Sequence, residues 1–170
     1  MKKLVDLTDL FSEQLKELLS SEKEQIEKMP KYINKAVSKE LKSLLQKNME
    51  QTKQHAKRLE DSLALLGENK KAIECNVMNE LLDRGLHIGK KSDNKDVLEA
   101  GLVMSVQCIK HFEIASYGTL VSFANLLGDK EVSNLLKMTL NEEKALDKEM
   151  TELAVKSINT RAREKSMEIA

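Results

Sequence analysis

Acidic side chains recur where apolar ones are expected, one on each of three long segments with apolar helical patterning. Glu22, Glu113 and Glu143 fall in the centre of the apolar stripe of their segments when residues are placed about 100° apart around a helix. Asp147 lies one turn beyond Glu143, close beside it. Inward carboxylates from facing helices are the usual ligands of di-iron and di-manganese sites in helical bundles. The spacing therefore predicts an acidic, metal-binding layer at mid-height.

A fourth long segment carries a hydroxyl and an imidazole at the matching depth. Thr52 lies in the centre of its stripe and His55 at the edge. A single inward histidine is usually a core residue and not a metal ligand. Because three inward acids are expected at the same depth, His55 is a candidate ligand. Thr52 is not expected to ligate. Glu50 and His111 lie about 160° away from the inward positions and are predicted to face outward.

Lys110 lies at the edge of the stripe that carries Glu113, one helical turn before it. Burying an unpaired carboxylate costs several kcal/mol, and a whole domain is stable by roughly 5–15 kcal/mol. A positive group must therefore lie among the acids. An ammonium has three donors and no lone pair, so Lys110 is not expected to ligate a metal but can itself neutralise carboxylates.

Five helices are predicted to position these side chains, with apolar spacing and stop signals giving their extents. The expected ranges are 6–29, 39–66, 76–86, 93–127 and 130–157. Their boundaries are marked by helix breakers and caps: Pro30 as a kink or restart, Gly67, Gly89, Asp93 or Asn94, and Gly128.

The lengths of these helices predict an all-α topology. Two long hairpins, joined by a crossover that carries the short third helix, make the ferritin-like four-helix bundle with one long crossover. Residues 1–158 are expected to form this single domain. Residues 159–170 are expected to be a charged tail that frays.

Composition excludes several classes of partner. Lys plus Arg and Asp plus Glu both number 28, so no charge excess favours nucleic acid or an anionic membrane. The longest uncharged run, 100–109, is far shorter than the roughly 20 residues of a membrane span. Cys75 and Cys108 have no metal-binding or disulfide spacing. A cytoplasmic protein is expected.

Four sequence blocks carry a family resemblance: "LLSSEKEQIEKMPKYINKA", "NMEQTKQHAKRLE", "KHFEIASYGTL" and "LNEEKALDKEMTELA". They resemble the YciF-like stress-protein family of bacterial ferritin-like domains, relatives of the rubrerythrins, over about residues 7–154. The third block, with its H-[FY]-E-I-A-x-Y-G core, is the most specific. The resemblance implies a ferritin-like fold, a homodimer and a di-metal centre, with no settled biochemical activity.

The resemblance also implies roles by position. Glu22 matches the glutamate of the first helix. Thr52 and His55 match a T-x-x-H pattern where rubrerythrins have E-x-x-H. Glu143 and Asp147 match the acids of the last helix, with Asp147 where rubrerythrins have a histidine.

The third long helix, 93–127, matches in part only. Glu113 matches the second acid of the family's E-H-[FY]-E pattern, but Lys110 stands where the first acid is expected. This exchange removes one ligand and adds a positive charge, so a degenerate site with at most one iron or manganese ion is predicted. The candidate ligands are Glu22, His55, Glu113, Glu143 and Asp147.

Two functions stay open at this point. One is a stress-associated ferritin-like protein with a residual metal site; any activity would be of the di-iron oxidase or peroxidase type, although metal binding does not imply turnover. The other is a metal-free structural or interaction protein of the stress response, in which Lys110 replaces an ion by pairing with the buried acids.

Overall fold

The computed structural model describes the backbone of residues 3–169 and the side chains of residues 3–164. The regular secondary structure of these residues is helical, and none of the described helices is long and apolar enough to cross a membrane. The elements are α1 (Leu7–Lys35), α2 (Lys39–Leu65), α3 (Asn76–Lys91), α4 (Lys95–Leu127), α5 (Lys130–Leu153), a π-helical turn (Ala154–Ile158) and α6 (Asn159–Ile169).

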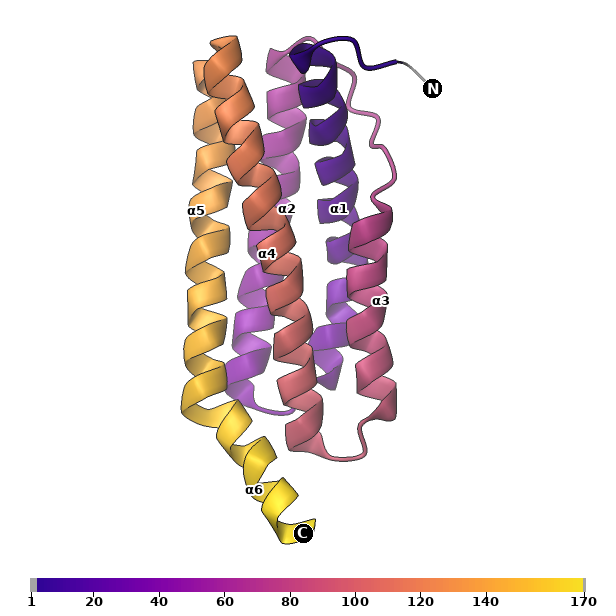
Figure 1. Ribbon diagram of the computed structural model, residues 1–170, viewed down its shortest axis with the longest axis vertical. Coiled ribbons are helices and arrows are strands. Elements are labelled where there is room, and N and C mark those ends of the chain that lie inside the picture. Colours follow the sequence, from indigo (N-terminus) through magenta and orange to yellow (C-terminus); the bar gives the residue numbers. More distant parts are fainter. Residues whose placement is uncertain (1–2, 170) are drawn as a thin grey trace.

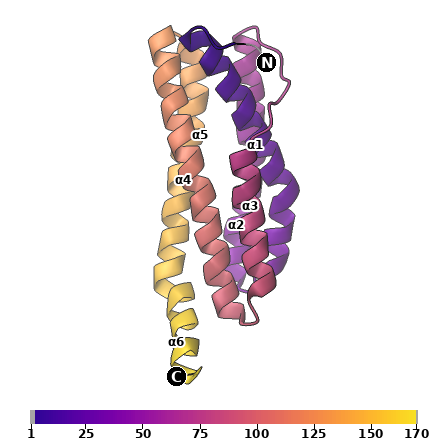
Figure 2. The ribbon, with the colours of Figure 1, turned by 45° about the vertical axis from the view of Figure 1, so that its right-hand side comes forward.

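The four long helices form the predicted bundle (Figure 1). Helix α1 pairs with α2, and α4 pairs with α5, while contacts between α2 and α5 and between α1 and α4 join the two hairpins. Helix α3 lies in the crossover and packs along α1 and α4 (Figure 2). The ferritin-like four-helix bundle with a short extra helix in its long crossover is therefore confirmed.

Several helix ends follow from the local sequence. Asn94, rather than Asp93, caps α4, because its side chain accepts hydrogen bonds from the backbone N–H groups of Asp96 and Val97. Gly128 ends α4 with a left-handed φ of 85°, which favours glycine.

Pro30 does not restart the first helix. Helix α1 continues through it to Lys35. Beyond the proline, Tyr32 is fully buried and its hydroxyl donates a 2.7 Å hydrogen bond to the carbonyl of Leu82 in α3. This burial and hydrogen bond favour the continued helix and oppose a proline penalty of about 3 kcal/mol.

Gly89 does not end the third helix, which runs to Lys91. The glycines of α3 instead permit close packing against α1. A Cβ built on Gly85 would lie 2.7 Å from Cζ of Tyr32, and one on Gly89 would lie 2.8 Å from Cδ of Lys35. The buried Tyr32 ring has little room to move aside, so close contact between the helices accounts for Gly85, whereas the Lys35 side chain beside Gly89 is flexible.

The charged C-terminal segment, which the sequence predicts to fray, forms helix α6 beyond the end of the bundle (Figure 1). Arg161 donates to Oδ1 of Asp96 at 2.9 Å and to Oε2 of Glu99 at 2.8 Å. The other oxygen of Glu99 accepts hydrogen bonds from the backbone N–H groups of Val37 and Ser38, in the turn between α1 and α2. Buried Glu99 therefore ties the tail to the first hairpin.

Buried apolar side chains form two clusters, one toward each end of the bundle. The first cluster includes buried residues within 11–19 of α1 and 117–124 of α4. The second cluster includes buried residues within 29–45 and 102–109. Buried polar side chains separate the two clusters: Glu22, Gln25, Asn48, Thr52, His55, Lys110, Glu113 and Glu143. The acidic layer predicted at mid-height is therefore present, and the fold builds it from all four long helices.

Candidate metal centre

Each long helix turns at least one ionisable side chain into the layer. Glu22 comes from α1, His55 from α2, Lys110 and Glu113 from α4, and Glu143 from α5, and none is more than 1% exposed. The inward orientation predicted from helical spacing is therefore confirmed, including that of Lys110.

Lys110 lies among three oxygen atoms. Its Nζ is 2.7 Å from Oε2 of Glu113 and 2.8 Å from Oε2 of Glu143, and it donates a 3.0 Å hydrogen bond to Oδ1 of Asn48. Burial alone would lower the pKa of Lys110, but the carboxylates of Glu113, Glu143 and Glu22 outweigh this effect and raise it. The ammonium is thus a fixed positive charge in the core.

Both oxygens of Glu113 are engaged by the protein. One contacts Lys110, and the other accepts a hydrogen bond from Nε2 of Gln25. Burial and the neighbouring Glu143 carboxylate raise the pKa of Glu113, although Lys110 opposes them. Glu113 therefore pairs with Lys110 through Oε2 and with Gln25 through Oε1, and it is not part of the group of side chains that could hold an ion.

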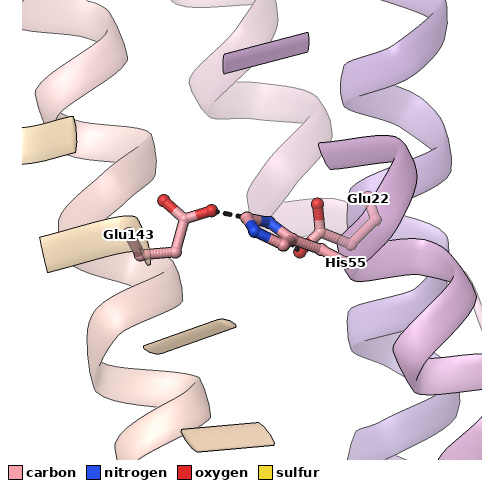
Figure 3. Close-up of side chains that lie close together, drawn as sticks. All are labelled: Glu22, His55 and Glu143. Carbon is pink, nitrogen blue, oxygen red and sulfur yellow. Dashed lines mark ion pairs between the residues drawn. The ribbon is translucent and has the colours of Figure 1, made fainter. Parts of the chain in front are cut away.

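Glu22, His55 and Glu143 converge in the remaining corner of the layer (Figure 3). Nδ1 of His55 is 3.0 Å from Oε1 of Glu143 and 3.7 Å from Oε1 of Glu22. Each residue offers one ligand atom, and these atoms lie within 4.8 Å of one another. Among the described residues, this is the one group of ligand atoms that lie so close together.

Orphaned polar atoms show that this corner suits a cation. Oε2 of Glu22, Oε1 of Glu143 and Nδ1 of His55 are buried, and none makes a hydrogen bond with any group in the described part of the chain. Such atoms are costly unless a positive group satisfies them. Two carboxylate oxygens and an imidazole nitrogen are suitable donors for iron or manganese. The residues therefore fit one metal ion.

Tyr117 adds an orienting contact on the Glu22 side. Its hydroxyl donates a 2.6 Å hydrogen bond to Oε1 of Glu22, and its ring meets that of His55 edge-on at 6.3 Å between centroids. Burial, followed by the charges of Glu113 and Glu143, raises the pKa of Glu22 well above its usual value. Tyr117 is the tyrosine of the H-[FY]-E-I-A-x-Y-G pattern, to which the sequence alone assigns no role.

A pair of residues that sequence analysis missed holds the outer side of the histidine. Nε2 of His55 is 2.9 Å from Oε2 of Glu142, and Arg58 binds Glu142 through two hydrogen bonds of 2.8 and 2.9 Å. Burial alone would raise the pKa of Glu142, but Arg58 and His55 outweigh it and lower it. The one available signal was the position of Glu142 next to Glu143.

Asp147 is not brought into the layer. It is half-buried, and its Oδ2 lies 3.5 Å from Nε2 of exposed His111. One turn of helix rotates it about 40° from Glu143, toward His111 of α4. Glu50 faces outward as predicted and pairs with Lys53 at 2.6 Å. Thr52 is buried, and its hydroxyl makes no hydrogen bond with the described residues.

Fold and site together define a ferritin-like four-helix bundle in which a lysine shares the carboxylate layer. A family model described as a domain of unknown function, DUF892, matches residues 6–163, so the chain belongs to the DUF892 family. It is 30% identical to Protein YciF of Escherichia coli strain K12 over 161 residues, which are 94% of this chain and 97% of that protein.

Two solved structures are similar over most of the chain. The crystal structure of the E. coli stress protein YciF matches with a TM-score of 0.88 and 29% identity, and the match covers 92% of this chain and 99% of that one. YcfI, a putative structural protein from Rhodopseudomonas palustris, matches with a TM-score of 0.86 and 28% identity, covering 88% and 96%. The predicted resemblance to the YciF-like family is therefore confirmed.

Proposed function

We propose that this chain is a stress-associated ferritin-like protein that binds at most one iron or manganese ion, held by Glu22, His55 and Glu143. The observation that carries the proposal is the position of the Lys110 ammonium, within 2.8 Å of carboxylate oxygens from Glu113 and Glu143. It stands where a second cation would have to lie.

Electrostatics supports this stoichiometry. Two unit charges about 4 Å apart interact by about 4 kcal/mol at an effective dielectric constant near 20, so a divalent ion beside Lys110 would be strongly repelled. In the corner at Glu22, the buried acceptors Oε2 of Glu22 and Oε1 of Glu143 make no hydrogen bond among the described residues, whereas Oε2 of Glu113 and Oε2 of Glu143 lie within 2.8 Å of the Lys110 ammonium. One ion in that corner satisfies them.

The chain's own residues do the positioning. A bound iron or manganese ion would supply Lewis-acid and one-electron chemistry. Tyr117 holds one oxygen of Glu22 by its hydrogen bond, Lys110 holds one oxygen of Glu143, and the apolar clusters on both sides keep the layer away from bulk water.

A metal-free form is the second candidate, and the direct pairing of Lys110 with Glu113 and Glu143 favours it. In that form the Lys110 ammonium is the positive group that balances the buried carboxylates. The protein would then be a structural or interaction protein, as the description of the R. palustris relative suggests for that protein.

The association with stress rests on the description of E. coli YciF as a stress protein. A homodimer and a cytoplasmic location belong to the same proposal. Light scattering on the purified protein tests the dimer, and a mass equal to one chain would refute it.

Metal titration under anaerobic conditions tests the proposal. Purified protein is loaded with Mn²⁺ or Fe²⁺, and bound metal is measured by elemental analysis beside a Glu143→Gln variant. We expect one ion per wild-type chain, none in the variant, and a lower melting temperature after chelation. Two ions per chain would contradict the proposal, and no ion with an unchanged melting temperature would select the metal-free candidate.

A further inference from the structure

The outer nitrogen of His55 is held by a carboxylate that is itself held by an arginine. We propose that Glu142, fixed by Arg58, is a positioning residue that keeps the proton of His55 on Nε2, so that the lone pair on Nδ1 faces Glu22 and Glu143. Its consequence for ion binding rests on the proposed function, whereas the position of the proton does not.

The geometry leaves Glu142 little freedom. Nη1 of Arg58 donates to Oε2 of Glu142 at 2.8 Å, and Nη2 donates to Oε1 at 2.9 Å, so both carboxylate oxygens are bound. Nη1 also lies 3.2 Å from the hydroxyl oxygen of buried Thr139, which accepts a hydrogen bond from it. The carboxylate is therefore fixed in the plane that meets Nε2 of His55 at 2.9 Å.

A neutral imidazole has one donor and one acceptor nitrogen, whereas an ionised carboxylate only accepts. The hydrogen bond to Glu142 therefore requires the proton on Nε2. On the other side, Nδ1 is 3.0 Å from Oε1 of Glu143, and with the ring proton on Nε2 neither of these two atoms can donate to the other. Two acceptors facing each other in the core are what a cation would bridge.

Loss of Glu142 should reverse this arrangement. With no acceptor at Nε2, the single ring proton would be favoured on Nδ1, where it can donate to Glu143. The lone pair that binds an ion would then point toward Arg58 instead. Carboxylates that hold the second nitrogen of a metal-binding histidine act in this way, and their removal typically weakens metal binding about 10- to 100-fold.

The chain offers a matched control on the same two helices. Glu149 of α5 accepts two contacts, at 2.6 and 2.8 Å, from Lys47 of α2, but both side chains are well exposed. Glu149→Ala removes an ion pair between α2 and α5 without touching the layer. A merely structural role for Glu142 predicts that Glu142→Ala and Glu149→Ala behave alike.

The first readout is the position of the ring proton in metal-free protein. His87→Gln and His111→Gln remove the other two histidines of the chain, both exposed, and leave His55 as the one imidazole signal. Nitrogen chemical shifts are recorded at a pH where the ring carries one proton. We expect the Nε2–H form in this background and with Glu149→Ala, and the Nδ1–H form with Glu142→Ala. An unchanged Nε2–H form in Glu142→Ala would overturn the proposal.

The second readout is Mn²⁺ affinity, measured by electron paramagnetic resonance titration. We expect affinity about 10- to 100-fold weaker in Glu142→Ala and unchanged in Glu149→Ala. Glu142→Gln, whose amide oxygen can still accept from Nε2–H, should restore most of the loss. Glu142→Leu, which keeps much of the side-chain volume but has no acceptor, serves as the test variant if Glu142→Ala does not fold. Equal affinity of Glu142→Ala and Glu149→Ala would overturn the role in ion binding. Absence of Mn²⁺ binding in the wild type would refute the proposed function, while the ring-proton readout would still decide the positioning role.

Discussion

Nζ of Lys110 lies 2.8 Å from Oε2 of Glu143, and neither side chain is exposed to solvent. The two residues come from α4 and α5, so the contact also joins the two helices of the second hairpin. A buried ion pair of this kind is weak evidence for stability in itself, but its partners depend strongly on each other.

Lys110→Met should lower the free energy of unfolding by about 3–5 kcal/mol, because it leaves buried carboxylates without their counter-charge. Chemical denaturation measures the change. Lys53→Met is the control, since Lys53 forms an exposed pair with Glu50 and its loss should cost less than about 1 kcal/mol. Similar values for the two variants would show that Lys110 is not a buried counter-charge.

The two tyrosines should resist ionisation in the folded protein. Tyr32 and Tyr117 are fully buried, and burial raises the pKa of both above the usual value of about 10. Unfolded tyrosines ionise near pH 10, so the free energy of unfolding should fall as the pH rises above that value.

Ultraviolet absorbance of tyrosinate measures this directly, because the chain has two tyrosines and no tryptophan. We expect both to ionise together when the helical circular dichroism signal is lost. Ionisation of one tyrosine near pH 10 in the folded protein would disprove the burial of its hydroxyl.

Asp147→Asn should leave the number of bound Mn²⁺ ions unchanged, because Asp147 faces His111 outside the layer. Its stability change should stay below about 1 kcal/mol, since the partner histidine is exposed. Glu22→Gln, by contrast, should weaken or abolish binding. Elemental analysis and thermal denaturation compare the two, and loss of metal from Asp147→Asn would return this residue to the ligand set.

Gly85→Ala should destabilise the protein by roughly 1–3 kcal/mol through overpacking. The added Cβ would lie 2.7 Å from Cζ of Tyr32 and 2.8 Å from Cβ of Ser105. Gly118→Ala is the matched control within α4, since no heavy atom of a neighbouring group lies within 4 Å of its added Cβ. It should stabilise the helix by roughly 0.5–1 kcal/mol. Denaturation curves with the same sign of change for both would contradict the close packing of α3 on α1.

Much of this architecture follows from helical spacing alone. The angular rule turns Glu22, Lys110 and Glu113 inward without knowledge of the neighbouring helices, because a stripe must face the core. It fails for Asp147, where about 40° of rotation decides between the layer and the outer face. It also cannot find Arg58 and Glu142, since their role depends on how α2 meets α5 and not on their own stripes.

Local helix breakers were a weaker guide than apolar spacing. Pro30 and Gly89 carry strong stop signals, yet both lie inside helices. The contact of buried Tyr32 with α3 opposes a break at Pro30, and Gly89 lies against Lys35 of α1. Glu99 shows the same limit, because its partners in the turn after α1 and in α6 lie far from it in sequence.

Anomalous diffraction from Mn²⁺-soaked crystals tests most directly whether Lys110 takes the place of a second ion. We predict a single manganese peak among Glu22, His55 and Glu143, with Nζ of Lys110 still beside Glu113. A second peak next to Glu113, with the lysine displaced from the layer, would contradict the account.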